Sequence, residues 1–253
     1  MSAAASRVSS VQWRLVSNGS SRRLVPEEGD AVPEPAAVLF DIDGTLVDSN
    51  YLHAVTWHRA FREVDADVPI WRIHRSIGMD GDELLRTLAP DLDSETADTA
   101  SDLHSRYYLD RADELTLLPG AREILRHLHD AGLRVVLATS APPDELARLR
   151  GLLDAESWLY AVTGAEDVET AKPDPTIVQV ALDRAGVTPQ RAVFVGDTVW
   201  DMRACAKLGV AAIGVLSGGI SRGELTADGA AYVCDDVAHL RRDLRRSPLA
   251  SLL

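Results

Sequence analysis

Short, continuous apolar segments recur from Ala36 onward and constrain the fold more than any other feature of the chain. They read AVLFD (37–41), LRVVLATS (133–140), RAVFVGD (191–197), VAAIGVL (210–216) and AAYVCD (230–235). Their apolar residues are contiguous and do not alternate with polar ones, which is typical of strands buried on both faces of a parallel sheet. We therefore predict that these segments are parallel strands.

Helical patterns of about ten residues separate these segments. They include GAREILRHLHDAG (120–132), PTIVQVALDRAG (175–186) and WDMRACAKLG (200–209). Each ends on a glycine and the second begins with proline, as helices commonly do. Alternating strands and helices predict an α/β fold: a doubly wound, Rossmann-like parallel sheet with right-handed crossovers.

The alternation breaks between Asp48 and about Leu118, where helical segments follow one another without a convincing buried strand. An all-helical insert directly after the first strand predicts a small second domain that sits over the sheet. We expect a Rossmann-like core at 36–48 and 118–253 and a helical cap at 49–117. Residues 1–35 lack sustained periodicity and are rich in Ser, Ala, Arg and Pro, so we expect a flexible, disordered leader.

The composition excludes several classes of partner. The formal net charge is −13 and the pI about 4.9, which opposes binding to nucleic acid. No apolar stretch approaches the ~20 residues that span a bilayer. We expect a cytoplasmic protein that does not bind membranes and works as a monomer or homodimer.

Two carboxylates, Asp41 and Asp43, follow the first apolar segment, one residue apart. In an extended strand such residues point to the same side, about 6.5 to 7 Å apart. Ligands of open α/β sheets bind beyond the carboxyl ends of the strands, which is where Asp41 lies. Gly44 permits a tight exit from the strand. Both carboxylates are therefore expected to face one site.

A second acidic pair, Asp197 and Asp201, follows the segment RAVFVGD. If the two segments are neighbouring strands, four carboxylates converge. Two like charges 4 Å apart repel by about 4 kcal/mol at an effective dielectric constant of 20, so such a cluster requires protons or cations. A hard divalent cation, with Mg²⁺ the first choice, satisfies this requirement.

Lys172, in AKPDP, offers one more positive charge. Lys172 and Lys207 are the two lysines among 26 Lys and Arg residues, so a compact ammonium at position 172 indicates a specific requirement. Lys207 is interpreted as a solvated charge.

The segments DIDGTLVDS, LATSA, AKPDP and GDTVWD resemble, in order and spacing, the four signature motifs of the haloacid dehalogenase superfamily. The resemblance is to its phosphatase branch, which has a helical cap inserted after the first motif, and it covers about Ala36 to Leu240. It implies a phosphatase that acts on a small phosphorylated metabolite.

The resemblance also implies roles for individual residues. Asp41 matches the nucleophile that becomes an aspartyl phosphate, and Asp43 matches the general acid and base. Thr139 and Lys172 match the groups that bind and neutralise the transferring phosphoryl group. Ser140, the next residue of LATSA, is expected to bind substrate.

The same resemblance predicts how Mg²⁺ is bound. Asp197 and the Asp41 carboxylate match direct ligands, together with the backbone carbonyl of Asp43. Asp201 is expected to support the metal or the lysine, although its helical spacing from Asp197 also suits a helix cap.

Two cap residues are candidates for contacting the substrate. Arg75 lies in the expected cap loop RIHRSIGMDG (72–81) and can grip an anionic group, or it can be the exposed end of a basic helix. His53, in DSNYLHAVTW, can touch the substrate, pack between helices or contact a hinge near Asp48 or Leu118.

Other activities on the same fold remain alternatives. Dehalogenases of the superfamily lack the second aspartate, which Asp43 supplies, and phosphonate hydrolases need a cap lysine, which is absent between Asp48 and Leu118. A sugar-phosphate mutase is harder to dismiss, because DSNYLHAVTW is similar to the hinge and first cap helix of beta-phosphoglucomutase. However, the substrate loop SIGMDGDEL lacks the basic residues of the mutase. A phosphoacceptor signalling domain and a non-catalytic interaction scaffold also remain open.

Overall fold

The computed structural model describes residues 13–18, 21–26, 34–167, 172 and 174–253. The chain forms two compact units, residues 1–34 and residues 35–253. In the first unit, β1 (Trp13–Asn18) and β2 (Ser21–Pro26) form an antiparallel pair. Sequence analysis did not predict this pair in the expected leader. The other residues of the expected leader, up to residue 33, lie outside the described residues. The flexibility expected of them stays a prediction.

The second unit is built on a six-stranded sheet whose strands are all parallel, which confirms the predicted doubly wound fold. Five of the strands coincide with the contiguous apolar segments. The sixth, β7, was missed because it has three residues, of which only Thr163 is fully buried. In sheet order the strands are β10 (Ala230–Cys234), β9 (Ala211–Val215), β8 (Ala192–Gly196), β3 (Ala37–Phe40), β6 (Arg134–Ala138) and β7 (Ala161–Thr163).

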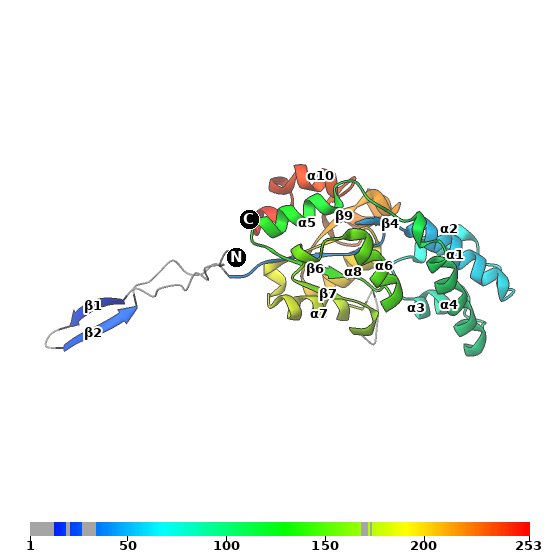
Figure 1. The fold of residues 1–253 in the computed structure, drawn as a ribbon, viewed down its shortest axis with the longest axis horizontal. Helices are drawn as coiled ribbons and strands as arrows, with labels where there is room; N and C mark the ends of the chain where they lie inside the picture. Colours follow the sequence, from blue (N-terminus) through cyan, green and yellow to red (C-terminus); the bar gives the residue numbers. More distant parts are fainter. Residues whose placement is uncertain (1–12, 19–20, 27–33, 168–171, 173) are drawn as a thin grey trace, which may run out of the picture. The chain divides into compact units, whose positions relative to one another are not determined.

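Alternate residues of the strands pack on opposite faces of the sheet. Val38 and Phe40 belong to the apolar cluster that includes α5, α6 and α10, whereas Ala37 and Leu39 belong to the cluster of α7, α8 and α9. Figure 1 shows α5 and α10 on one side of the sheet and α7 on the other. The core helices are α5 (Ala121–Asp130), α6 (Pro143–Leu153), α7 (Thr176–Ala185), α8 (Val199–Leu208), α9 (Arg222–Ala227) and α10 (Val237–Arg242).

The helical insert leaves and re-enters the core through a short antiparallel pair, β4 (Val47–Asp48) and β5 (Thr116–Leu117). Its helices share a separate apolar core around Trp57 and Phe61, and Figure 1 shows them grouped at one end of the unit. The predicted all-helical cap is thus present; its exact limits stay a prediction. The cap helices are α1 (Asn50–Glu63), α2 (Ile70–Ser76), α3 (Gly81–Leu88) and α4 (Ser94–Leu109).

The structure corrects the expected loop at 72–81, because its first half belongs to α2. Pro69 precedes this helix in an extended conformation, which suits a residue just outside a helix start. No helix in the described part of the chain is long and apolar enough to cross a bilayer.

Candidate active site

The buried carboxylates of Asp41, Asp197 and Asp201 meet at the carboxyl edge of the sheet. Strands β3 and β8 are neighbours with Phe40 opposite Val195, so the residues that follow each strand come together. One carboxylate oxygen from each acid lies within 4.8 Å of the others. The predicted convergence of these three acids is therefore seen in the structure.

Lys172 lies against this cluster and is 1% exposed. Its Nζ is 3.0 Å from Oδ1 of Asp41 and 2.7 Å from Oδ1 of Asp201, and it donates to the carbonyl of Ala138 at 3.3 Å. Burial lowers the pKa of the ammonium, but the charges of Asp201 and Asp41 outweigh it, so the pKa is raised above its usual range. Lys172 is therefore a permanent cation of the site.

One lysine does not neutralise the cluster. Burial raises the pKa of Asp41 to about 7, with the charges of Asp201 and Asp43 acting in the same direction and Lys172 opposing them. Burial, with the charges of Asp201 and Asp41, also raises the pKa of Asp197 well above its usual range. Such an uncompensated set of hard oxygen donors fits a divalent cation, which would restore the ionised form of Asp41.

Asp43 reaches the cavity by a different route from the predicted one. Strand β3 ends at Phe40, and Asp43 directly precedes a turn at 44–46, in which Gly44 has φ of 68° and the N–H of Gly44 donates to the carbonyl of Val47. The strand therefore does not continue through Asp43, which was the condition for the expected spacing of the two carboxylates. Their side chains nevertheless line the same cavity.

The carboxylate of Asp43 is held by Ser49 and His53. It accepts from the Ser49 hydroxyl at 2.5 Å, and its Oδ1 is 3.4 Å from Nε2 of His53. Burial raises the pKa of Asp43, but the hydrogen bonds and charge of His53 and the bond from Ser49 outweigh burial, so the pKa is lowered. Burial lowers the pKa of His53, but the hydrogen bond and charge of Asp43 outweigh burial, so the pKa is raised. The two groups thus favour a charged pair.

A hydrogen-bond chain fixes the orientation of His53. Nδ1 of His53 is 3.4 Å from Nε2 of His104, whose Nδ1 is 3.0 Å from the Thr56 hydroxyl. Thr56 donates its hydrogen to the carbonyl of Leu52 at 2.8 Å, and a carbonyl can only accept. Thr56 must therefore accept from His104, which leaves Nε2 of His104 as an acceptor for His53. Burial, aided by the charge of His53, lowers the pKa of His104 well below its usual value, consistent with a neutral ring.

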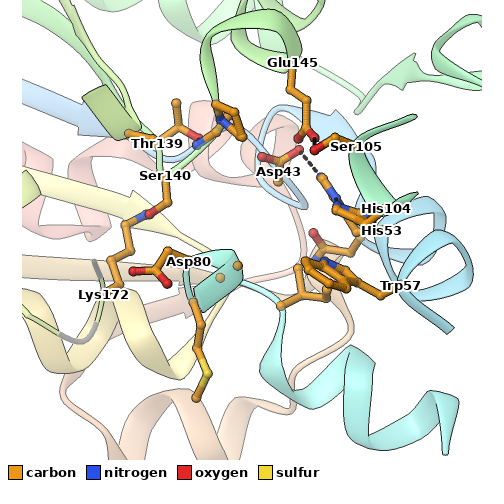
Figure 2. Close-up of a pocket in the computed structure, with 18 of the residues that line it drawn as sticks. Asp43, His53, Trp57, Asp80, His104, Ser105, Thr139, Ser140, Glu145 and Lys172 are labelled. Carbon is orange, nitrogen blue, oxygen red and sulfur yellow. Dashed lines mark hydrogen bonds and ion pairs between the residues drawn. The ribbon is translucent and has the colours of Figure 1, made fainter. Parts of the chain in front are cut away.

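A cavity of about 350 Å³ opens between the cap and the core at this point (Figure 2). Thr139 and Ser140 follow β6 and line it, as predicted. The Thr139 hydroxyl accepts from the N–H of Ala141 at 3.1 Å, whereas the buried Ser140 hydroxyl has no partner among the described residues. The cavity also contacts acidic and polar residues from the cap: Asn50, Asp80, Asp82, Ser101 and Ser105.

The structure does not bring Arg75 to this cavity. Arg75 lies on α2 and bonds through both terminal nitrogens to Glu224 of the core helix α9. Because residues 70–76 form a helix and not a loop over the substrate, the guanidinium is directed toward α9. Of the two cap candidates, His53 contacts the site and Arg75 does not.

Sequence analysis missed the residues that hold Asp197. Its carboxylate accepts from the Thr45 hydroxyl at 3.0 Å and from Nδ2 of Asn50 at 2.8 Å, and Asn50 also donates to the carbonyl of Gly218 at 3.3 Å. Gly218 belongs to SGGIS (217–221), which the sequence suggested was only a turn. A Cβ at Gly218 would lie 1.7 Å from Oδ2 of Asp197, so the glycine is required by close contact with the site.

Gly218→Ala is therefore expected to displace Asp197, to destabilise the fold by about 1 to 3 kcal/mol through overpacking, and to lower activity. Gly223→Ala is the control, because a Cβ there meets nothing within 4 Å; an exposed helical alanine is neutral or mildly stabilising. Urea unfolding of both variants measures the difference. Equal stability and activity of the two variants would contradict the close contact.

The fold and the site define a hydrolase whose buried carboxylates lie beyond a parallel sheet and beneath a helical cap. Residues 35–209 match the haloacid dehalogenase-like hydrolases, and the chain belongs to this family. The family predicted from the four motifs is confirmed.

Individual relatives agree with this assignment. The phosphoglycolate phosphatase of Pseudomonas savastanoi pv. phaseolicola (strain 1448A / Race 6) is 30% identical over 214 residues, which cover 81% of this chain and 78% of the relative. A hydrolase of known structure from Pseudomonas syringae is 32% identical with a TM-score of 0.80, covering 83% of this chain and 98% of its own. The beta-phosphoglucomutase structure from Clostridium difficile has a TM-score of 0.75 and covers 86% of this chain and 98% of its own. It is 19% identical and therefore shows the fold alone. The predicted enzyme class, a phosphatase, is confirmed.

Proposed function

We propose that this enzyme hydrolyses a small-molecule phosphate monoester through an aspartyl phosphate on Asp41, with Mg²⁺ as its cofactor. The observation that carries the proposal is the buried contact of Asp41 with Lys172, beside Asp197 and in a cavity that Asp43 also lines. This arrangement supplies a nucleophile, a positive charge for the phosphoryl oxygens and a second carboxyl for proton transfer. We place the protein in the cytoplasm, as a monomer or homodimer.

Two steps follow from these positions. A carboxylate oxygen of Asp41 attacks phosphorus and the ester P–O bond breaks, while Asp43 takes the proton of its charged pair with His53 and passes it to the leaving oxygen. Asp43 then takes a proton from water, which attacks the phosphorus of the aspartyl phosphate and releases inorganic phosphate. Lys172 neutralises the phosphoryl oxygens in both steps, and we assign the hydroxyls of Thr139 and Ser140, which line the same cavity, to binding them.

Asp41, Asp197 and the backbone carbonyl of Asp43 would hold Mg²⁺. When bound, the cation would neutralise negative charge on the transferring group. Asp201 has Oδ1 on Lys172 and Oδ2 on the Thr198 hydroxyl at 2.7 Å, so we assign it mainly to orienting the lysine.

Mg²⁺ is expected to raise the melting temperature of metal-free protein, because the cluster that binds it exists only in the folded state. At 100 times the dissociation constant the gain is about 2.7 kcal/mol. Asp197→Asn should lose most of this rise, whereas Asp91→Asn, at an exposed position, should keep it. Hydrolysis of p-nitrophenyl phosphate should require Mg²⁺ and stop in EDTA. Hydrolysis that persists in EDTA, without any thermal shift, would refute the metal assignment.

The mutase alternative makes a different product. A mutase returns an isomeric sugar phosphate, whereas the proposed hydrolase releases inorganic phosphate. Hydrolysis is favoured because Lys172 is the one lysine or arginine among the described residues that line the cavity. The charge of the cap residue His53 is paired with Asp43, so the described cap residues offer no free cation for a second phosphate. Phosphoglycolate, named by the curated relatives, is the first ester to assay alongside sugar phosphates.

A further inference from the structure

The cavity has two chemically different sides. Figure 2 shows Lys172 and Ser140 on one side and Glu145, Ser105 and His104 on the other, with Asp43 between them. Under the proposed function, phosphorus is attacked on the side of Asp41 and Lys172, and Asp43 protonates the leaving oxygen. The organic part of the substrate must then extend toward Glu145.

The side toward Glu145 is acidic. Glu145 lies on this side, whereas Figure 2 shows Asp80 on the side of Lys172. Asp82 also lines the cavity, and among the described lining residues Lys172 alone is a lysine or arginine. The neighbouring sequence VETAKP (168–173), parts of which lie outside the described residues, contains no other lysine or arginine. A second anionic group on the substrate therefore has no lysine or arginine to pair with on this side.

Glu145 is the most specific feature of this wall. It is the third residue of α6 and is 3% exposed. Among the described residues it accepts one long hydrogen bond, 3.5 Å, from the Ser105 hydroxyl of the cap. Burial raises the pKa of Glu145, and the charge of the nearby His53 opposes burial without cancelling it. A buried carboxylate that accepts so few hydrogen bonds is unfavourable unless another donor reaches it.

The two histidines nearby do not supply that donor. Ring nitrogens of His53 and His104 lie within 4.8 Å of a Glu145 oxygen. However, Nε2 of His53 is directed to Asp43 and its Nδ1 to His104, while Nδ1–H of His104 is used by Thr56. A donor group on a molecule in the cavity can complete the hydrogen bonding of Glu145.

We infer that the organic part of the substrate carries an amino or hydroxyl group that donates to Glu145 and that it carries no second anionic group. The inference rests on the proposed function and makes Glu145 a specificity-determining residue. A carboxylate at the same position would face Glu145 as a like charge in a partly buried site, where repulsion is strong. The chain is thus expected to discriminate against phosphoglycolate, the substrate named for its relatives.

Three esters of equal length test this inference: phosphoglycolate, ethylene glycol monophosphate and phosphoethanolamine. They differ in whether the two-carbon leaving group ends in a carboxylate, a hydroxyl or an amine. We expect kcat/KM to be at least about tenfold higher for the hydroxyl or the amine than for the carboxylate. Comparison of the two favoured esters identifies which donor the enzyme prefers.

The Glu145→Gln variant tests the residue itself. It keeps the size of the side chain and removes the charge, so the ratio of kcat/KM for phosphoglycolate to that for ethylene glycol monophosphate should rise about tenfold. Asp144→Asn removes the same charge from an exposed neighbour outside the cavity and should leave the ratio unchanged. If Glu145→Gln fails to fold, Asp82→Asn, at the exposed rim of the same wall, should shift the ratio in the same direction.

Hydrolysis of p-nitrophenyl phosphate separates the two levels of the proposal. If it proceeds while phosphoglycolate is the preferred ester and Glu145→Gln leaves the ratio unchanged, this inference is overturned and the proposed function stands. If no ester of any kind is hydrolysed, both fail. If p-nitrophenyl phosphate alone is hydrolysed, the three esters are tested as inhibitors of that reaction. The hydroxyl or amine ester must then inhibit more tightly than phosphoglycolate, and any other order of the inhibition constants overturns the inference.

Discussion

Replacing Asp41 with asparagine is expected to lower kcat for p-nitrophenyl phosphate by at least about a thousandfold, because an amide oxygen does not form the acyl phosphate. The substitution is nearly isosteric, and its oxygen can still accept from Lys172. It also removes a charge that burial and the neighbouring Asp201 disfavour. We therefore expect the variant to be at least as stable as the wild type, so that lost activity cannot be attributed to unfolding. Steady-state kinetics and thermal melting, run together, measure both effects.

The control for this substitution is Asp130→Asn, at the exposed end of α5, which should keep wild-type kinetics. Activity of Asp41→Asn within tenfold of the wild type would remove Asp41 from the role of nucleophile. It would also weaken the assignment of Lys172, whose place in the site depends on contact with Asp41.

Replacing Lys172 with methionine is expected to lower both stability and activity. The substitution leaves Asp41 and Asp201 without their buried cation, and breaking such a pair costs about 3 to 5 kcal/mol. The phosphoryl oxygens would also lose their fixed positive charge, and we expect kcat to fall at least about a hundredfold. Denaturant unfolding without metal, and kinetics at saturating Mg²⁺, separate the two effects.

Lys207→Met serves as the matched control, because Lys207 is the other lysine of the chain and lies exposed on α8. Lys172→Arg adds a second comparison: the larger guanidinium enters a site where lysine is 1% exposed, so partial function at best is expected. If Lys172→Met matched Lys207→Met in unfolding free energy, the ion pairs of Lys172 would not be a major source of stability.

The main sheet was predictable because burial on both faces leaves a direct trace in the sequence. Contiguous apolar residues are found in β3, β6, β8, β9 and β10, and each of these strands is present. Strand β7 leaves no such trace, because it is short and half-buried at the edge of the sheet. Helix α2 was missed for a similar reason: of its seven residues, Ile73 and Ser76 alone are buried, which is too few for a helical period.

The acids were predictable because they follow strands whose ends must meet in a parallel sheet. Lys172 was singled out for a different reason, because lysine is rare in this chain. Their supporting residues were not predictable in this way. Gly218, Glu145 and His104 reach the site from segments far apart in the sequence, and no local pattern encodes those contacts. The catalytic roles of Asp41, Asp43 and Lys172 stay predictions that only chemistry can test.

Trapping the covalent intermediate tests the central claim most directly. p-Nitrophenolate leaves without an acid, so Asp43→Asn should still be phosphorylated on Asp41 but should hydrolyse the acyl phosphate slowly. A burst of p-nitrophenolate equal to the enzyme concentration is expected. Borohydride reduction of the quenched enzyme should then convert Asp41 to homoserine, which peptide mass spectrometry locates. Homoserine at another position, or a burst without any homoserine, would contradict an aspartyl phosphate on Asp41.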